Sequence, residues 1–362
     1  MQMINSYSAV SLLQMQTDTL ERLGAAQTLY IYGAGGAGKT LLHLLKKNAI
    51  KISGFLDSNA ARDGNVVEGV VVQHVKNVNL TGSVVIVASM FYREIVKSFQ
   101  TELSNAKELL FYFNYIEHEE HFFLAKEELT KADTLLSRLA DDESRQILNS
   151  LLSYRATLNK FFLDSIVSAP QYFCTLPAAV DYSIFYDVGA FTGDTLESMK
   201  QQYIFPRQVI CFEPDPKNFG VLSTHAADQN VELHKLAVGS QNGVIQFAST
   251  SLGYSSKVSN AGSECVNQVT LDTFCQGQAP LPTYLKIDVE GSDLDVLVGA
   301  TDVLSRCRPT IAVSIYHLPE HLYTIPLWII DNLTDYSVYI RHHRDSIYET
   351  ICYAIPNENV KK

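Results

Sequence analysis

Three short apolar runs that each end in a carboxylate constrain the fold of this chain more than any other feature. The runs and their acids are residues 184–186 before Asp187, residues 209–212 before Glu213, and residues 285–287 before Asp288. β-favouring runs bounded by turn residues predict buried strands. In an open parallel sheet, ligands bind just beyond the carboxyl ends of the strands. We therefore expect the three acids to line one ligand site at the edge of a parallel sheet.

The length and the order of predicted elements indicate more than one domain. A chain of 362 residues exceeds the size at which one core keeps growing. Residues 1–113 and 181–362 each read as an α/β module, and residues 114–180 are poor in strand signals and rich in helical spacing. We predict an α/β protein with two Rossmann-like domains joined by a helical segment.

Charge and composition limit the partners. The net charge of -11 disfavours nucleic acids and anionic membranes, which require a basic surface. Neither a signal-peptide pattern nor an apolar run near the ~18 residues of a membrane span is present. The six cysteines lack a Cys-x-x-Cys pair and read as reduced thiols. We expect a cytoplasmic protein, for which a homodimer is one allowed assembly.

The first module opens with a glycine loop, GAGGAGKT, at residues 33–40. The loop fits the P-loop pattern, but that reading also requires a strand ending in a magnesium-binding Asp, and residues 83–90 contain no carboxylate. It also fits G-x-G-x-x-G, and Asp57 follows near the distance of about 20 residues expected for a ribose-binding acid. The candidate residues of this second nucleotide site are Gly33, Gly35, Gly36, Gly38 and Asp57.

Two interpretations of the glycine loop remain open. GAGGAGK followed by GFLDSN resembles the nucleotide-sugar-binding domain that precedes some acyltransferases, which implies a sugar nucleotide rather than NAD as ligand. Alternatively, the glycines serve only tight packing in a Rossmann-like domain that binds no ligand.

The loop of the second module, residues 187–194 (DVGAFTGD), differs in chemistry because Phe191 occupies the place of a middle glycine. A pyrophosphate would fit poorly there, whereas S-adenosylmethionine carries no phosphate and needs close backbone approach at Gly189. Asp187, Gly189, Thr192 and Gly193 are therefore candidate cofactor-binding residues. Asp187 would orient the loop or meet the aminoacyl end of the cofactor.

Further cofactor contacts are expected from the next strand ends. Glu213 lies one helix and one strand after the loop, where its carboxylate can accept both ribose hydroxyls. Ala237 and Val238 are placed to flank the adenine, with ordinary sheet core as the alternative. Asp288 closes the site from the fourth strand, with a buried salt bridge as the competing explanation.

DVGAFTGDT, FEPDP, AVG, VTLDTF, LKIDVEGSDLDVLVGA and SIYH, over about residues 181–355, resemble the FkbM-type methyltransferases. The resemblance implies a seven-stranded class I methyltransferase fold and S-adenosylmethionine-dependent O-methylation of sugars, glycans or natural products. The N-terminal Rossmann-like domain and the DDESR helix at residues 141–145 are similar to those of a subgroup of this family.

His317 is the candidate general base, because it ends a predicted strand at residues 310–316 and should face the same crevice as Asp288. The alternative is a histidine that caps the next helix or packs beneath the loop. Strand alternation places the neighbouring Tyr316 on the other face of the sheet. Glu290 and His321 are candidates for holding the acceptor.

Three further patterns bear on metals and anions. HLPEH at residues 317–321 fits a zinc motif, but Pro319 begins the helix after His317, so the two histidines need not share a helix face. Asp288 with His317 could bind magnesium, although histidine is an unusual ligand for that ion; we predict no metal. The basic residues within 341–344 either receive an anionic acceptor or form a polar turn.

The favoured function is an S-adenosylmethionine-dependent O-methyltransferase acting on a hydroxyl of a sugar, glycan or natural product. The alternative is a nucleotide-sugar- or NAD-binding protein or oxidoreductase that uses the N-terminal glycine loop.

Overall fold

The computed structural model describes residues 8–115, 117–168, 170–226, 230–248, 257–258, 264–277 and 279–361. The chain divides into two compact units. Unit 1 holds the residues up to Asp133 with Asn149–Ile166 and Asp345–Ile347, and unit 2 holds Thr134–Leu148, Val167–Arg344 and the residues from Tyr348 onward. The chain passes between the units inside helix α5 (Lys126–Leu136), inside helix α6 (Asp142–Thr157) and after Ile166, all within the segment predicted to be a helical linker, and again on either side of Asp345–Ile347.

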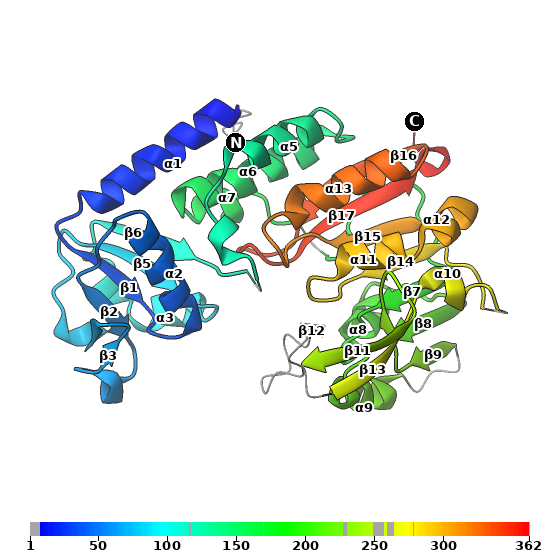
Figure 1. The fold of residues 1–362 in the computed structure, drawn as a ribbon, viewed down its shortest axis with the longest axis horizontal. Coiled ribbons are helices and arrows are strands. Elements are labelled where there is room, and N and C mark those ends of the chain that lie inside the picture. Colours follow the sequence, from blue (N-terminus) through cyan, green and yellow to red (C-terminus); the bar gives the residue numbers. More distant parts are fainter. Residues whose placement is uncertain are drawn as a thin grey trace. The chain divides into compact units, whose positions relative to one another are not determined.

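Unit 1 contains a six-stranded sheet (Figure 1) in the order β3-β4-β2-β1-β5-β6. Its strands are β1 (Leu29–Tyr32), β2 (Gly54–Asp57), β3 (Val66–Val67), β4 (Val70–His74), β5 (Val84–Ala88) and β6 (Glu108–Tyr112). All neighbours pair in parallel except β3 with β4. The helices of this part are α1 (Ala9–Gly24), α2 (Gly36–Lys47), α3 (Tyr92–Ser98) and α4 (Gln100–Leu103). The predicted α/β character of this module is confirmed.

Helix α2 shows why the glycine loop leads into a helix. Its leucines at positions 41, 42, 44 and 45 are buried, and α2 contacts β1 and β5. Gly38 must be a glycine, because an added Cβ would lie 1.8 Å from the Gly33 carbonyl oxygen. The close approach fixes the loop between β1 and α2.

Three helices follow the first sheet: α5 (Lys126–Leu136), α6 and α7 (Phe161–Asp164). Asp141 lies directly before α6, and its carboxylate accepts the Ser144 backbone N–H at 2.9 Å. The same carboxylate pairs with the buried guanidinium of Arg341 at 2.6 Å, which fixes the start of α6 within unit 2.

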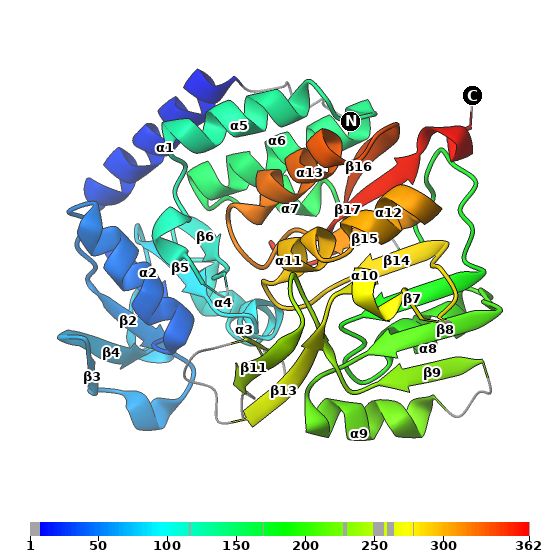
Figure 2. The same ribbon diagram turned by 45° about the vertical axis from the view of Figure 1, so that its right-hand side comes forward.

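Unit 2 is organised around a seven-stranded sheet in the order β16-β17-β15-β14-β7-β8-β9 (Figure 2). The strands are β7 (Ile184–Val188), β8 (Gln208–Phe212), β9 (Val231–His234), β14 (Tyr284–Ile287), β15 (Thr310–Ser314), β16 (Tyr336–His342) and β17 (Thr350–Pro356). The strands β7, β8, β9, β14 and β15 are parallel. This arrangement confirms the predicted seven-stranded fold.

β17 runs antiparallel to β15 and to β16. The first residue of β17 consequently lies at the edge of the sheet where the parallel strands end. The hairpin between β16 and β17 is thus brought to the same edge as the residues that follow β7, β8, β14 and β15.

The remaining elements of unit 2 surround this sheet. Helix α9 begins with Pro216, and the Asp215 side chain caps its first backbone N–H groups. Helix α13 packs on β16 and β17. The helices are α8 (Asp194–Gln201), α9 (Pro216–His225), α10 (Leu271–Phe274), α11 (Asp293–Val298), α12 (Thr301–Cys307) and α13 (His321–Asn332). A smaller sheet has the order β10-β13-β11-β12, with β10 (Ala237–Val238), β11 (Gly243–Ala248), β12 (Lys257–Val258) and β13 (Glu264–Val269).

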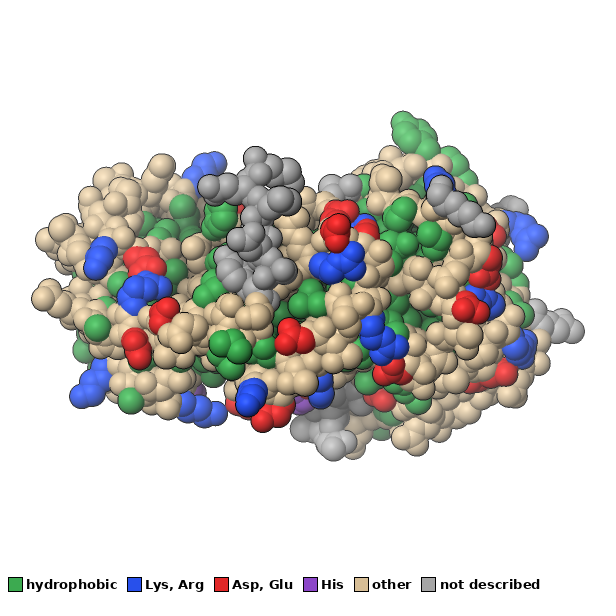
Figure 3. Space-filling model, turned by 90° about the horizontal axis from the view of Figure 1, so that it is seen from above, with side chains coloured by type: hydrophobic (Ala, Val, Ile, Leu, Met, Phe, Trp, Pro, Cys, Tyr) green, Lys and Arg blue, Asp and Glu red, His purple; other side chains and the backbone are tan. Residues whose placement is uncertain are grey.

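Acidic and basic side chains are interspersed on the face drawn in Figure 3. Among the described residues, no helix has the length and apolar character needed to cross a membrane.

Candidate active site

The predicted site residues gather at the carboxyl edge of the unit 2 sheet. Asp187 lies within β7, Glu213 follows β8, Asp288 follows β14, and His317 follows β15 by three residues. The predicted strand at residues 310–316 is shorter than expected and ends at Ser314.

Asp187 is fully buried beneath the first loop, and its partner is a lysine that the sequence analysis did not single out. The Lys286 Nζ lies 2.8 Å from the Asp187 carboxylate. It also donates to the Gly189 carbonyl oxygen at 2.6 Å and lies 5.5 Å from the centre of the Tyr172 ring. Burial opposes the charge of Lys286, but Asp187 and Asp288 outweigh it and raise its pKa. This geometry favours a role for Asp187 in orienting the loop.

Gly189 brings the loop against the neighbouring strand end. Its φ is +83°, and an added Cβ would lie 1.8 Å from the Asp288 carbonyl oxygen. Phe191 also has a positive φ of 48°, and Gly193, with φ 94°, precedes helix α8. The Thr192 carbonyl oxygen contacts the His225 imidazole Nδ1 at 2.7 Å.

Glu213 connects the loop after β7 with the loop after β8. Its carboxylate accepts the backbone N–H of Phe191 at 2.9 Å and that of Asp215 at 2.9 Å. Burial raises the pKa of Glu213 to about 7, although both backbone hydrogen bonds oppose the shift. The carboxylate therefore lies beside the 189–193 loop and keeps lone pairs for a further donor.

Ala237 and Val238 are buried, but they form β10 in the smaller sheet rather than the end of β9. β10 pairs with β13, and Ala237 packs with Val266. The structure thus gives these two residues a place in a small apolar core, as the alternative interpretation allows.

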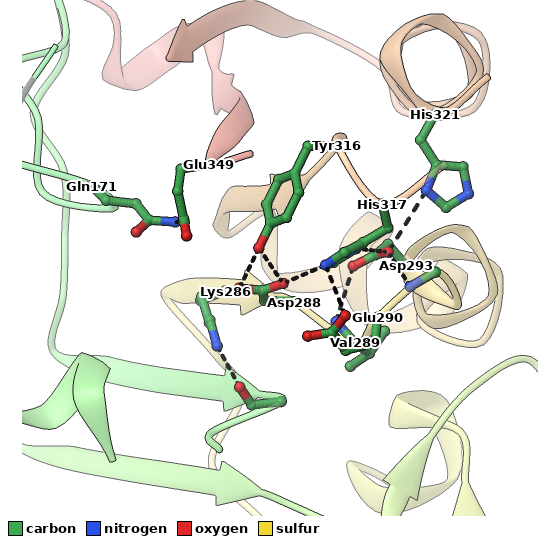
Figure 4. A network of polar contacts seen from close by, with 12 residues as sticks. Gln171, Lys286, Asp288, Val289, Glu290, Asp293, Tyr316, His317, His321 and Glu349 are labelled. Carbon is green, nitrogen blue, oxygen red and sulfur yellow. Dashed lines mark hydrogen bonds and ion pairs between the residues drawn. The ribbon is translucent and has the colours of Figure 1, made fainter. Parts of the chain in front are cut away.

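The polar network around Asp288 is drawn in Figure 4, where Tyr316 and His317 point toward Asp288 and Glu290 lies beside the His317 ring. Its carboxylate accepts the Tyr172 hydroxyl at 2.8 Å and the Tyr316 hydroxyl at 3.3 Å. The His317 Nε2 lies 3.1 Å from the same carboxylate. Burial acts to raise the pKa of Asp288, but His317, Lys286 and Tyr172 together hold it well below its usual value. Asp288 is therefore an ionised carboxylate.

The predicted orientation of Tyr316 is wrong. Its ring centre lies 4.3 Å from that of His317, and its hydroxyl bonds to Asp288. The reason is that β15 ends at Ser314, so strand alternation no longer applies two residues later.

Asp293, at the start of α11, is a second carboxylate on His317. The Asp293 Oδ2 lies 2.8 Å from the His317 Nδ1, and both residues are buried. Burial acts to lower the pKa of His317, but Asp293 and Asp288 raise it well above its usual value. The His317 ring therefore lies between two acids.

Of the two predicted acceptor-binding residues, Glu290 lies 3.8 Å from the His317 Nε2, and burial raises its pKa to about 7. His321 is buried at the first position of α13, with its Nδ1 3.7 Å from Asp293. Glu349, directly before β17, joins this end of the site and is hydrogen-bonded by the Gln171 side chain. Burial, with the nearby Asp288, raises the pKa of Glu349 to about 7.

Within the described residues, the donor atoms of Asp288, Asp293 and His317 lie within 4.8 Å of one another, close enough for a metal ion. Both ring nitrogens of His317 nevertheless face carboxylates, at 2.8 and 3.1 Å. In this arrangement His317 supplies the positive charge between the two acids, and the absence of a metal stays a prediction from the sequence.

Of the basic residues within 341–344, Arg341 and His342 end strand β16 and only the last two follow it, and most of them have partners inside unit 2. Arg341 pairs with Asp141 and Glu143, and the His343 ring contacts the Ser168 carbonyl oxygen at 2.9 Å. Arg344 is half exposed, with its guanidinium 3.8 Å from Glu349.

In unit 1, the structure brings Asp57 close to the glycine loop. The Asp57 carboxylate accepts the Asn59 backbone N–H at 2.9 Å and pairs with Arg62 at 2.7 Å. The Arg62 guanidinium also donates to the Ala34 carbonyl oxygen at 3.2 Å. Packing requires a glycine at positions 33 and 38, whereas a Cβ added at Gly35 or Gly36 would meet no atom within 4 Å.

Comparison with known proteins gives three findings. Residues 187–344 match the family model of the methyltransferase FkbM domain. Over 101 residues, 26% of this chain, the sequence is 33% identical to the hexuronic acid methyltransferase AglP of Haloferax volcanii. The match spans only 42% of that relative's length. The fold is similar to the crystal structure of methyltransferase FkbM from Methylobacillus flagellatus KT, with a TM-score of 0.66, 19% identity and coverage of 95% of this chain and 98% of the other.

Proposed function

Because residues 187–344 form an FkbM-type methyltransferase domain, we propose that this chain transfers the methyl group of S-adenosylmethionine to a hydroxyl of a sugar, glycan or natural product. The observation that carries the proposal is the contact between Glu213 and the 189–193 loop at the carboxyl edge of the sheet. S-adenosylmethionine would supply an activated methyl group there. Transfer would form a bond between the methyl carbon and the acceptor oxygen, break the carbon–sulfur bond and pass the hydroxyl proton to the Asp288 carboxylate.

The proposed cofactor residues are those of the first loop and the strand ends around it. Gly189, Thr192 and Gly193 would provide backbone approach, and Glu213 would accept the ribose hydroxyls. Asp187 would orient the loop through Lys286. The contact of Ala237 and Val238 with the adenine of the cofactor stays a prediction.

Asp288 and His317 are the proposed catalytic pair at the acceptor end, with Glu290 and His321 as proposed acceptor contacts. Asp288 is ionised and part-exposed, so it can accept a hydrogen bond from an acceptor hydroxyl. A sugar acceptor is supported by the similarity to a hexuronic acid methyltransferase. Alignment of the acceptor is expected to supply most of the rate enhancement, because orientation corresponds to effective molarities of about 10^5 to 10^8 M.

The test is incubation of the full chain with methyl-labelled S-adenosylmethionine and a panel of sugar nucleotides and oligosaccharides, followed by mass spectrometry. We expect a product heavier by one methyl group on oxygen. Asp288→Ala should abolish the product, and Asp302→Ala, an exposed acid on α12, should not. Binding of NAD in place of S-adenosylmethionine would contradict the proposal.

A sugar nucleotide at the N-terminal glycine loop is the second proposed ligand. Gly33 and Gly38 have packing reasons to be glycine, but Gly35 and Gly36 face open space at the start of α2. Helix N-termini favour the negative charge of phosphates. Calorimetry with UDP-sugars and NAD tests the site, with Gly36→Asp as the variant that places a carboxylate there. We expect this change to abolish UDP-sugar binding and to leave S-adenosylmethionine binding unchanged; equal UDP-sugar affinity in both proteins would contradict the site.

A further inference from the structure

Asp293 connects the loop after β14 with His317. Its Oδ1 accepts the Val289 backbone N–H at 3.0 Å, and its Oδ2 accepts that of Gly291 at 3.1 Å. The same Oδ2 lies 2.8 Å from the His317 Nδ1. Asp293 is fully buried, so these three N–H groups replace the water that would otherwise solvate its charge.

The surroundings of the His317 ring determine its protonation. Asp293 faces Nδ1, whereas Asp288 at 3.1 Å and Glu290 at 3.8 Å face Nε2. A neutral imidazole has one N–H and one lone pair, so one ring nitrogen would direct a lone pair at a carboxylate. An imidazolium carries an N–H on both nitrogens, so neither carboxylate would face a lone pair. The Nδ1 contact is a hydrogen bond and the Nε2 contact an ion pair, and together they favour the protonated ring, which is only 1% exposed.

We propose that Asp293 is a positioning residue that keeps His317 an imidazolium and, through it, holds Asp288 fixed and ionised at the acceptor end. The link runs from the backbone of the 289–291 loop through Asp293 to the ring and then to Asp288, which Tyr172 and Tyr316 also hold. The functional meaning of this link rests on the proposed methyl transfer. His317 then acts as a fixed cation and not as the proton acceptor predicted from the sequence.

The substitution Asp293→Asn tests this link with little change in shape. The amide can donate to His317 Nδ1, which stabilises the neutral ring with its proton on Nε2, while the hydrogen bond that Oδ2 accepts from the Gly291 backbone N–H is lost. Loss of a neighbouring carboxylate is expected to lower a histidine pKa by about 1 to 3 units. Asp295→Asn is the matched control, because Asp295 is exposed on the same helix α11.

The readout is the pH titration of the imidazole by NMR in the full chain labelled at histidine nitrogens, with His317 assigned from its missing signal in His317→Gln. We expect the wild type and Asp295→Asn to keep an imidazolium through pH 8, and Asp293→Asn to show a neutral ring. A neutral His317 at pH 7 in the wild type would overturn the proposal, even if the variant did not fold. An unchanged titration in a folded Asp293→Asn would also overturn it.

This titration needs no methyl donor or acceptor, so it stands apart from the proposed function. Where methyl transfer is detected, Asp293→Asn should lower kcat at least tenfold with the KM for S-adenosylmethionine unchanged. A rise of that KM by the same factor as the fall in kcat would indicate a collapsed cofactor loop and would contradict a positioning role. A failed methyl-transfer assay with a titration as expected would remove the proposed function alone.

Discussion

Glu213 is the residue on which the proposed cofactor site depends most directly. If its carboxylate accepts both ribose hydroxyls, Glu213→Ala should weaken S-adenosylmethionine binding about 100-fold or more, since each such bond contributes about 1.5 to 3 kcal/mol. Calorimetry of the full chain measures this. Glu197→Ala, at an exposed position on α8, is the control. Equal affinity in wild type and Glu213→Ala would rule out the assignment.

The same carboxyl group predicts a pH dependence of stability. Burial raises the pKa of Glu213 to about 7, so between pH 4.5 and 7 the folded chain holds a proton that the unfolded chain has released. The stability contribution is therefore complete below the unfolded pKa and is lost as pH rises through the folded one. We expect the unfolding free energy of the wild type, relative to Glu213→Gln, to fall by up to about 3 kcal/mol over this range. Urea unfolding at several pH values measures it; a constant difference would contradict the shift.

Lys286 should behave as one half of a buried pair. Lys286→Met leaves the Asp187 charge without its cation, a change expected to cost about 3 to 5 kcal/mol of stability. Adding Asp187→Asn should recover part of that loss, because it removes the uncompensated charge. Thermal unfolding of both variants and of Lys200→Met, at an exposed site on α8, provides the comparison. A double variant no more stable than Lys286→Met would contradict the pairing.

At the scale of elements, the prediction concerns the contact between the first loop and β14. A methyl group added at Gly189 would lie 1.8 Å from the Asp288 carbonyl oxygen, at a φ that disfavours any side chain. Gly189→Ala should therefore separate the two strand ends and abolish S-adenosylmethionine binding. Gly220→Ala, within α9 and with no atom near its added Cβ, should leave affinity unchanged. Full affinity in Gly189→Ala would show that this contact does not shape the site.

The sequence predicts well which residues stand at the strand ends, and poorly which other side chains lie around them. Asp187, Glu213, Asp288 and His317 were found because apolar periodicity locates parallel strands, and parallel strands share one ligand edge. The sequence does not indicate Glu349, because this residue precedes an antiparallel strand. Its place at the ligand edge follows only from the pairing of β17 with β15. Tyr172 reaches Asp288 across a sequence distance that no local pattern spans.

Lys286 could have been found. A lysine inside a fully buried strand is rare unless it is paired, and the run Tyr284–Ile287 contains one. Asp293 gave a weaker signal, since an acid in the first turn of a helix is common. Its bond to His317 depends on a loop whose course includes a positive φ of 54° at Glu290, which the sequence does not specify.

At the scale of the whole molecule, the division into units predicts where a stable fragment that contains unit 2 should begin. Residues 134–148 belong to unit 2, where Asp141 pairs with the buried Arg341 and the Ser144 hydroxyl accepts the Ile340 backbone N–H. A fragment that starts at residue 134 should therefore be more stable than one that starts at the predicted boundary, residue 181. Circular dichroism during heating compares them. Equal melting temperatures would contradict this contribution of the α6 start.

The antiparallel course of β17 has a consequence for engineering. Glu349 reaches the site on the turn before β17, whereas Gly189 and Glu213 reach it from the far side of β14. Under the proposed function, a combinatorial library at Tyr348 and Glu349, both in unit 2, would therefore vary the acceptor side of the site and leave the side of Gly189 and Glu213 unchanged. Selection from such a library would separate the residues that set acceptor choice from those that hold the proposed methyl donor.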